Sequence, residues 1–267
     1  MKRLNELEVA EVCLRYQQGE SSILLAQRMG VSSVAIRGLL DRRGIKRRSV
    51  DEAARKYTMN HEFFQQIDTE AKAYWLGFFA ADGCVTDDGT IRIHLASQDE
   101  SHLYLFRKAI SSTHPIKQQE NGKYLSSSIS VYSPTMANDL LLLGITPRNT
   151  HTLRMPNCLG LNKQMTRHFA RGYIDGDGGF YLTESRRKEP GYQFSVTSNE
   201  TFIQELQTFL CEELDLSRTK VYRRNKLSAI TTMSYCGKQQ LAKIARWLYK
   251  NTCLYMERKR EKIEHIL

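Results

Sequence analysis

Two segments of the chain carry residues whose type and spacing could support metal-dependent chemistry. Residues 74–83 (YWLGFFAADG) recur as residues 169–178 (FARGYIDGDG), so that Asp82 and Asp177, each followed by glycine, lie 95 positions apart. Each segment is apolar nearly all round, which is typical of a buried helix, and its aspartate would stand at the C-terminal end, where the helix dipole is already negative. Divalent cations would neutralise two such carboxylates, and hard oxygen ligands suit Mg²⁺, which assists phosphoryl displacement in two-metal sites. An Asp-Gly pair is also a common turn, and this remains the alternative for either position alone.

The sequence around these segments is duplicated as well. Residues 91–97 match residues 192–198 at an offset of 101, and residues 123–133 match residues 226–236 at an offset of 103. Offsets that grow in chain order from 95 to 103 indicate two copies of one unit with small loop insertions.

Within each copy the apolar periodicity changes in the same order, from the motif helix to alternating strands, a helix, a second strand pair and a last helix. The order per copy is αββαββα. We therefore predict an α+β fold of two pseudo-symmetric repeats. Residues 71–160 form the first repeat and residues 161–267 the second.

The two motifs and the repeat order resemble the LAGLIDADG homing endonucleases in their single-chain, two-motif form, over about residues 70–262. The resemblance implies a monomer in which the motif helices pack side by side and two curved sheets form a saddle on double-stranded DNA. It implies site-specific cutting of both strands by Mg²⁺-dependent phosphodiester hydrolysis. Gly77 and Gly172, followed one turn later by Ala81 and Gly176, would allow the close backbone approach. The glycine after each aspartate is expected to end its helix in a left-handed conformation.

The resemblance also assigns roles within the motif. The metal ligands are the carboxylates of Asp82 and Asp177, one for each strand cut, with the carbonyls of Ala81 and Gly176 as secondary ligands. The sixth motif position is Ala80 in the first copy and Asp175 in the second. That position is not a ligand, so the difference does not put activity in doubt.

Polar and basic residues would support the two carboxylates. Ser97 and Ser198 fall where the family carries residues that hold the attacking water, although both could be surface strand ends. Lys123 and Lys226 form a symmetric pair that could assist the leaving group or contact phosphates.

The family's lysine more often follows the helix after the second hairpin. There the chain has Arg148 and Asn149 in the first copy and Arg258 and Lys259 in the second. Asn149 departs from the family pattern and leaves open unequal cutting of the two strands.

The alternation along each strand predicts which face of each sheet is exposed to solvent. On that face, Arg and Gln would form paired hydrogen bonds with guanine and adenine, and Ser, Thr and Tyr would bind through their hydroxyl groups or through water. The predicted DNA contacts in the first copy are Arg92, His94, Ser126, Ser128, Ser130, Tyr132 and Arg148, and those in the second are Arg186, Arg187, Lys188, Gln193, Ser195, Thr197, Lys220, Tyr222, Arg224 and Lys259.

The first 45 residues predict three short helices. An apolar stripe from Val9 to Tyr16 predicts the first helix, which Gly19 ends. Serines that can cap a helix precede the next two helices, and Gly30 supplies the turn between them. This spacing resembles the helix-turn-helix of resolvase-like and transposase-like proteins, in which the last helix enters the major groove. Residues near its start would face bases, namely Ser33, Val34 and Arg37, whereas Arg42, Arg43, Lys46, Arg47 and Arg48 would hold phosphates or enter the minor groove. A three-helix packing module without DNA is the alternative. We assign residues 1–48 to this domain and residues 49–70 to a linker and approach helix.

The charge of the chain is concentrated locally. The formal net charge is +10, with +5 on residues 36–60 (8 Lys and Arg against 3 Asp and Glu), −3 on residues 61–150 (7 against 10) and +8 on residues 151–267 (20 against 12). Such a distribution suits a polyanionic partner.

The six scattered cysteines argue against a disulfide framework or a structural zinc. Because no signal core or long apolar run is present, we expect a cytoplasmic protein without a membrane association.

Three alternative functions are compatible with parts of the sequence. An intron RNA maturase would use the same saddle, although the helix-turn-helix favours DNA. A non-cutting transcription regulator would be expected to lose Asp82 and Asp177, and both are present. An intein-embedded endonuclease would show a splicing terminus, so a freestanding enzyme is favoured.

Overall fold

The computed structural model describes residues 4–47, 57–122, 124–147, 151–156, 160–183, 191–223 and 230–264. The chain divides into two compact units, Met1–Thr58 and Met59–Leu267, each with its own hydrophobic core. The predicted domain boundary at residue 48 lies outside the described residues. In the predicted linker, residues 57–69 are turns and coil, and Phe63 and Phe64 are buried in the core of the larger unit.

The smaller unit consists of α1 (Glu6–Gln17), α2 (Ser22–Met29) and α3 (Ser33–Arg42). The Oγ atoms of Ser21 and Ser32 accept the amide hydrogens of Leu24 and Ala35, so both predicted serine caps are present. Gly30 has φ 67°, and α2 and α3 cross at 108°. An angle of about 90–120° across a short glycine turn is the geometry of a helix-turn-helix.

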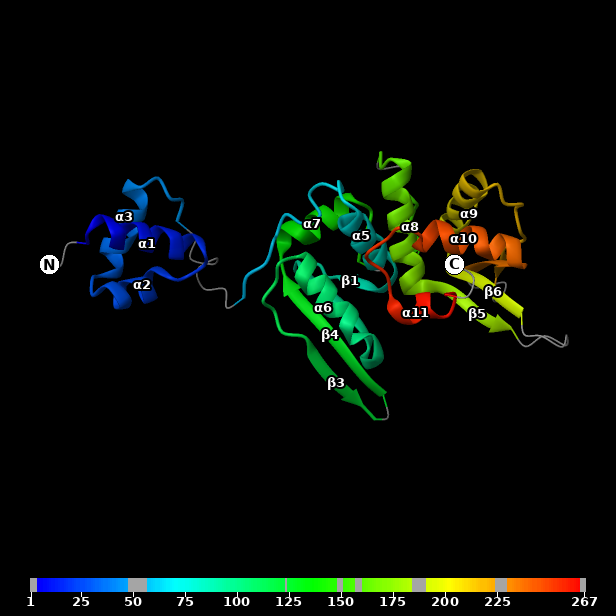
Figure 1. Ribbon diagram of the computed structural model, residues 1–267, viewed down its shortest axis with the longest axis horizontal. Helices are drawn as coiled ribbons and strands as arrows, with labels where there is room; N and C mark the ends of the chain where they lie inside the picture. The colour runs from blue at the N-terminus through cyan, green and yellow to red at the C-terminus, as the bar shows by residue number, and fades with distance from the viewer. Residues whose placement is uncertain are drawn as a thin grey trace. The chain divides into compact units, whose positions relative to one another are not determined.

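The larger unit contains the two predicted repeats (Figure 1). The first contains α5 (Glu70–Asp82), β1 (Gly83–Val85), β2 (Thr90–Ala96), a short 3₁₀ turn η1 (Ser97–Asp99), α6 (Glu100–Ala109), β3 (Lys117–Asn121), β4 (Tyr124–Tyr132) and α7 (Pro134–Leu142). The second contains α8 (Lys163–Asp177), β5 (Gly178–Thr183), β6 (Gly191–Asn199), α9 (Glu200–Leu214), β7 (Tyr222–Arg223), β8 (Ile230–Cys236), α10 (Lys238–Tyr249) and α11 (Glu257–Glu261). The order αββαββα is thus confirmed, with α11 as an unpredicted addition.

The two antiparallel sheets have the same topology. Their strand orders are β1-β2-β4-β3 and β5-β6-β8-β7. On β2, Ile91, Ile93 and Leu95 are buried against the helices of their repeat, whereas Arg92 and His94 are exposed on the other face. Each sheet therefore has one face in the core and one uncovered, as the alternation predicts. The fold is α+β with internal pseudo-two-fold symmetry.

Helices α5 and α8 pack side by side at the centre of this unit, flanked by the two sheets (Figure 1). A Cβ atom at Gly77 would lie 1.9 Å from the Phe169 carbonyl oxygen, and one at Gly172 would lie 1.9 Å from the Tyr74 carbonyl oxygen. The two contacts are symmetric equivalents. Both positions must be glycine because backbone stands where a side chain would begin.

The predicted left-handed caps at Gly83 and Gly178 are wrong. Their φ values are −80° and −125°, and each glycine continues directly into a strand. Glycine is needed for space: a Cβ atom at Gly83 would lie 2.3 Å from the Phe79 ring, and one at Gly178 would lie 3.0 Å from Val196.

Within the described residues, no single helix is long and apolar enough to cross a membrane. The pair α2 and α3 is apolar enough in combination, but it is bent by 108°.

Candidate active site

The two motif aspartates are the last residues of the two central helices, Asp82 of α5 and Asp177 of α8. These helix ends lie together, because a Cβ atom at Gly176 would lie 2.3 Å from the Ala81 Cβ and 3.1 Å from Asp82 Oδ2. The structure therefore brings the predicted metal-ligand set, Ala81, Asp82, Gly176 and Asp177, to one place at the base of the two sheets.

Both carboxylates are held in surroundings that disfavour their charge. Asp82 is half-buried, and burial raises its pKa. Solvent reaches Asp177, yet the protein packed around it and then the neighbouring Asp82 carboxylate raise its pKa to about 6. Two anions this close at negative helix ends favour either proton uptake or a nearby cation.

One such cation is Lys259. Its Nζ donates hydrogen bonds to the carbonyl oxygens of Gly176 at 2.6 Å, Gly178 at 2.8 Å and Ile174 at 3.3 Å. Burial lowers the pKa of the Lys259 ammonium. Its positive charge offsets part of the rise in the pKa of both Asp82 and Asp177. The ammonium thus occupies the C-terminal end of α8 and binds the Gly176 carbonyl that the resemblance assigns to a metal.

The segment that carries Lys259 is held to the first repeat by an ion pair. Arg258 Nε and Nη2 donate to Asp99 Oδ1 and Oδ2 at 2.9 and 2.8 Å, and Asp99 is buried. This bidentate pair holds the guanidinium in a fixed plane. It anchors α11 beside α6 of the other repeat.

A buried polar network around Asp175 holds the same segment. The Asp175 carboxylate is fully buried and accepts hydrogen bonds from Tyr74 Oη at 2.8 Å, Tyr249 Oη at 2.6 Å and the Met256 amide at 2.8 Å. Tyr74 Oη also pairs with His102 Nε2 at 2.9 Å. Sequence reasoning missed this structural role of Asp175, because its partners are far away in the chain.

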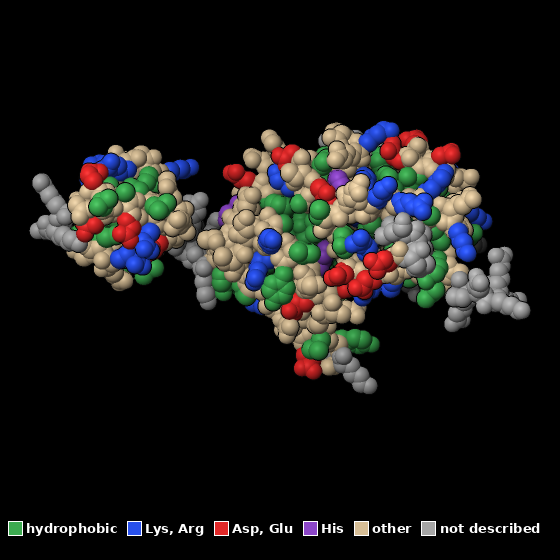
Figure 2. Space-filling model, viewed as in Figure 1, with side chains coloured by type: hydrophobic (Ala, Val, Ile, Leu, Met, Phe, Trp, Pro, Cys, Tyr) green, Lys and Arg blue, Asp and Glu red, His purple; other side chains and the backbone are tan. Residues whose placement is uncertain are grey.

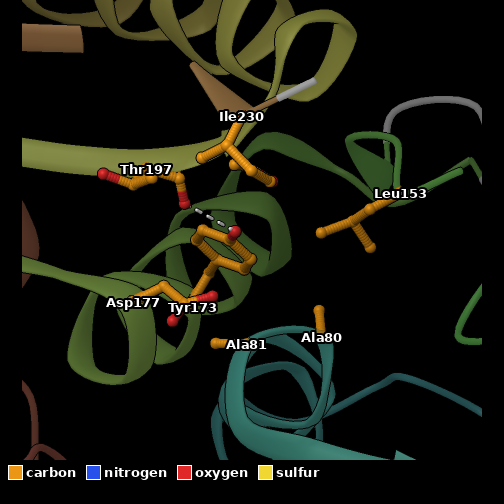
Figure 3. Close-up of a pocket in the computed structure, with 8 residues that line it drawn as sticks. Ala80, Ala81, Leu153, Tyr173, Asp177, Thr197 and Ile230 are labelled. Atoms are coloured by element: carbon orange, nitrogen blue, oxygen red, sulfur yellow. Dashed lines mark hydrogen bonds between the residues drawn. The ribbon is translucent and has the colours of Figure 1, made fainter. Parts of the chain in front are cut away.

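A cavity of about 220 Å³ opens beside Asp177. It is lined by Ala80, Ala81, Leu153, Tyr173, Asp177, Thr197, Ser198 and Ile230 (Figure 3). Ser198, predicted to hold the attacking water, therefore shares a cavity with the carboxylate of its own repeat. Its counterpart Ser97 is different: the Ser97 Oγ is buried and has no hydrogen-bond partner among the described residues.

Several solved structures resemble this chain at low sequence identity. Meganuclease I-SmaMI bound to uncleaveable DNA is 13% identical with a TM-score of 0.49, and the match covers 73% of this chain and 86% of that one. The LAGLIDADG homing endonuclease I-LtrWI bound to target DNA is 13% identical with a TM-score of 0.48, and the match covers 75% and 89%. I-SmaMI is itself described as a LAGLIDADG homing endonuclease and has also been solved with calcium ions. The chain is similar to LAGLIDADG homing endonucleases. No protein-family model matches the sequence, and no curated protein matches it.

The predicted DNA-facing residues of the sheets share one face where they are described. Arg92 pairs with Ser130 and His94 with Ser128 across β2 and β4, and Tyr132 lies on the same face. In the second sheet, Ser195 pairs with Ser234, while Thr197, Thr232 and Tyr222 stand in one row. Lys220 lies just before β7, with its Nζ 5.8 Å from the centre of the Tyr222 ring. Thr232 and Ser234 are further candidates that the strand register adds.

The remaining basic predictions divide into two groups. Eight of the predicted residues lie outside the described part of the chain: Arg48, Lys123, Arg148, Arg186, Arg187, Lys188, Arg224 and Lys226. On the smaller unit, Ser33 is the first residue of α3, and Arg37 and Arg42 are exposed along this helix. Arg43 and Arg47 are ion-paired with Glu6 at 2.6 Å and Asp41 at 2.8 Å, so part of their charge is offset within the unit.

Proposed function

We propose that this protein is a site-specific endonuclease that cuts both strands of duplex DNA by metal-dependent phosphodiester hydrolysis. The observation that carries the proposal is the meeting of Asp82 and Asp177 at two adjacent helix ends, within one folded unit that also presents two uncovered polar sheet faces. Because one chain holds both motifs, it supplies both carboxylates and is proposed to act as a monomer.

The donor atoms at this site fit Mg²⁺. Asp82 and Asp177 offer carboxylate oxygens and Ala81 offers a carbonyl oxygen, and Mg²⁺ favours such hard ligands with water and phosphate completing its shell. The Gly176 carbonyl already accepts a hydrogen bond from Lys259, so it would have to be shared with the ammonium. No group of three or more His, Cys, Asp and Glu side chains that could form a metal cage lies in the described part of the chain. A bound Mg²⁺ would stabilise negative charge on the phosphate during displacement.

Hydrolysis adds one water molecule across a P–O ester bond. The water oxygen bonds to phosphorus, one ester P–O bond breaks, the water loses a proton to solvent, and the leaving oxygen gains one. In this reaction Ser198 would orient water beside Asp177, and Lys259 would hold positive charge near both carboxylates. A divalent cation held by Asp82 and Asp177 would offset the negative charge of the two carboxylates, of the helix ends and of the incoming phosphate.

The smaller unit is proposed to contact DNA separately, with α3 in the major groove. Ser33, Val34 and Arg37 stand at its exposed start, and Val34 is 67% exposed although apolar, which suits contact with a thymine methyl group. Arg37→Ala is expected to weaken binding and to relax sequence preference at about one base pair, by roughly 1–3 kcal/mol. The measurement is binding to a set of single-base target variants.

The test of the nuclease proposal is a cleavage screen on a randomised duplex library and on DNA flanking the gene, with Mg²⁺ or with EDTA. We expect Mg²⁺-dependent double-strand breaks that Asp82→Asn and Asp177→Asn abolish, while both variants still bind the selected site. Asp87→Asn, in the exposed turn between β1 and β2, is the matched control and should cut normally.

Sequence-selective binding without cutting by the unaltered protein would contradict the proposal and favour a transcription regulator. Preferential binding and folding of a structured intron RNA would favour a maturase.

A further inference from the structure

The two repeats place equivalent aromatic clusters beside the central helices, but at one equivalent position only the second cluster carries a hydroxyl group. In the first repeat, Phe78 packs on His102 with ring centres 4.8 Å apart. In the second, Tyr173 packs on Phe202 with ring centres 4.3 Å apart. Phe78 and Tyr173 both follow the close-packed glycine of their motif, so they are symmetric equivalents that differ by one hydroxyl group.

The Tyr173 hydroxyl group lies at the cavity beside Asp177. The side chain is only 1% exposed, and its Oη donates a hydrogen bond to the Thr197 carbonyl oxygen at 3.0 Å (Figure 3). Since a phenol has one hydrogen to donate, its oxygen lone pairs remain as acceptors. Burial raises the pKa of Tyr173, so the group stays a neutral phenol, and its interaction with Asp177 lowers the pKa of that carboxyl.

The cavity has the size and the polar partners that ordered water needs. Its volume of about 220 Å³ admits several water molecules, each of which takes roughly 30 Å³ in the liquid. Tyr173, Ser198 and Asp177 supply polar atoms to its lining, while Leu153 and Ile230 supply apolar side chains. Water in such a site can be fixed in orientation by two or three hydrogen bonds.

The opposite half offers no equivalent hydroxyl group. Phe78 stands where Tyr173 stands, and the Ser97 Oγ has no partner in the described structure. Asp175 and Gly176 replace the cavity residues Ala80 and Ala81, and the Gly176 carbonyl is bound by the Lys259 ammonium. The charged groups that act on Asp82 are Lys259 and Asp99.

We propose that Tyr173 is a positioning residue that accepts a hydrogen bond from the hydrolytic water in the Asp177 half-site, and that the Asp82 half-site lacks this aid. The inference rests on the proposed nuclease function. With one hydrogen held by Tyr173 and the oxygen steadied by Ser198, a water lone pair faces the phosphate. The two DNA strands are then cut at unequal rates, the faster cut belonging to the Asp177 half-site.

The test measures the cutting rate of each strand separately, with duplex target labelled on both strands and saturating protein with Mg²⁺. Tyr173→Phe is expected to slow one strand about tenfold, the effect of losing one hydrogen bond worth about 1.4 kcal/mol, and to leave the other strand within twofold. Ser198→Ala should slow the same strand. Target affinity should stay unchanged for Tyr173→Phe. The lost hydrogen bond to the Thr197 carbonyl should lower the unfolding temperature slightly, and a purely structural role would slow both strands equally.

Tyr235→Phe is the matched control. It removes a buried hydroxyl group of the same repeat that faces Cys211 Sγ at 3.5 Å, on the helix-covered side of the sheet, and should change neither rate. Equal slowing of both strands by Tyr173→Phe, or no slowing, overturns the inference while the nuclease function stands. Failure of the unaltered protein to cut any target overturns both.

Discussion

The two halves of the candidate site share one backbone plan but differ in what surrounds each carboxylate. Beside Asp177 there is a cavity lined by three residues with hydroxyl groups, Tyr173, Thr197 and Ser198. Near Asp82, Phe78 takes the position that Tyr173 holds in the second repeat, and the charges of Lys259 and Asp99 act on the carboxylate. The helix contact, where the glycine backbones meet, is therefore the same in both copies. The side chains beyond this contact differ between them.

The segments that follow the last helix of each repeat show the same divergence. Each crosses to the opposite repeat: the Leu153 carbonyl accepts from Asn199 Nδ2 at 3.0 Å, and Arg258 Nε donates to Asp99 Oδ1 at 2.9 Å. Only the second of these segments brings a lysine to the carboxylates among the described residues. The repeats also differ in charge, because residues 61–150 carry −3 and residues 151–267 carry +8 (Figure 2 shows Lys and Arg gathered over α9 and α10).

The strongest test of the shared backbone plan is to add a methyl group at the helix contact. Gly77→Ala and Gly172→Ala should each lower the free energy of unfolding by about 3 kcal/mol or more, because the new Cβ atom meets a carbonyl oxygen that cannot move alone. Urea denaturation of the larger unit measures this. Gly38→Ala in α3 faces only the flexible Arg42 side chain at 3.6 Å and should not destabilise its unit. Very different costs at Gly77 and Gly172 would contradict the symmetry.

The next test removes the network that exists on one side only. Asp175→Ala should destabilise the larger unit by about 3 kcal/mol, since it leaves two buried tyrosine hydroxyl groups and the Met256 amide without their acceptor. It should also free the segment that carries Lys259, which amide hydrogen exchange at residues 254–262 would report. Ala137→Gly on α7, a buried small residue of the first repeat, is the control for simple destabilisation. Faster exchange in both variants would mean that Asp175 does not hold this segment.

These features divide into those that local sequence predicts and those that it does not. The serine caps, the Gly30 turn and the repeat order follow from neighbouring residues and were predicted. Gly83 is extended because it already belongs to β1, where it pairs with Ile93, and this pairing is not visible in the residues next to it. The Asp175 network joins residues up to 101 positions apart, and only the fold reveals that they meet.

A third test uses acid to separate the two aromatic clusters. Burial lowers the pKa of His102 to about 4, whereas its counterpart in the second repeat, Phe202, does not titrate. A base with a lowered pKa favours the folded state when neutral, so stability is complete above the unfolded pKa of about 6.5 and falls as the pH drops toward 4. The lowered pKa of His102 alone should reduce the free energy of unfolding by about 2 kcal/mol at pH 5 relative to pH 7. Tyr74, Asp99 and Lys259 are the polar groups that act on it.

The matching variant is His102→Phe, which gives the first repeat the residue of the second. The loss of stability between pH 7 and pH 5, measured by urea denaturation, should shrink, and the remainder is expected from His168, whose pKa burial also lowers to about 4. An unchanged pH profile would show that His102 carries no such penalty.

The smallest effect concerns charge on the second sheet. Lys220 is exposed beside Tyr222 at the uncovered face, so Lys220→Gln should remove about one phosphate contact and lower the slope of log affinity against log salt by about 0.9. Lys163→Gln removes the same charge at the start of α8, where Lys163 is paired with Glu213 at 2.5 Å, and should leave the slope unchanged. Binding titrations at several salt concentrations measure both. Because the same charge is lost in each variant, equal slopes would show that the uncovered sheet face is not where the second repeat meets DNA.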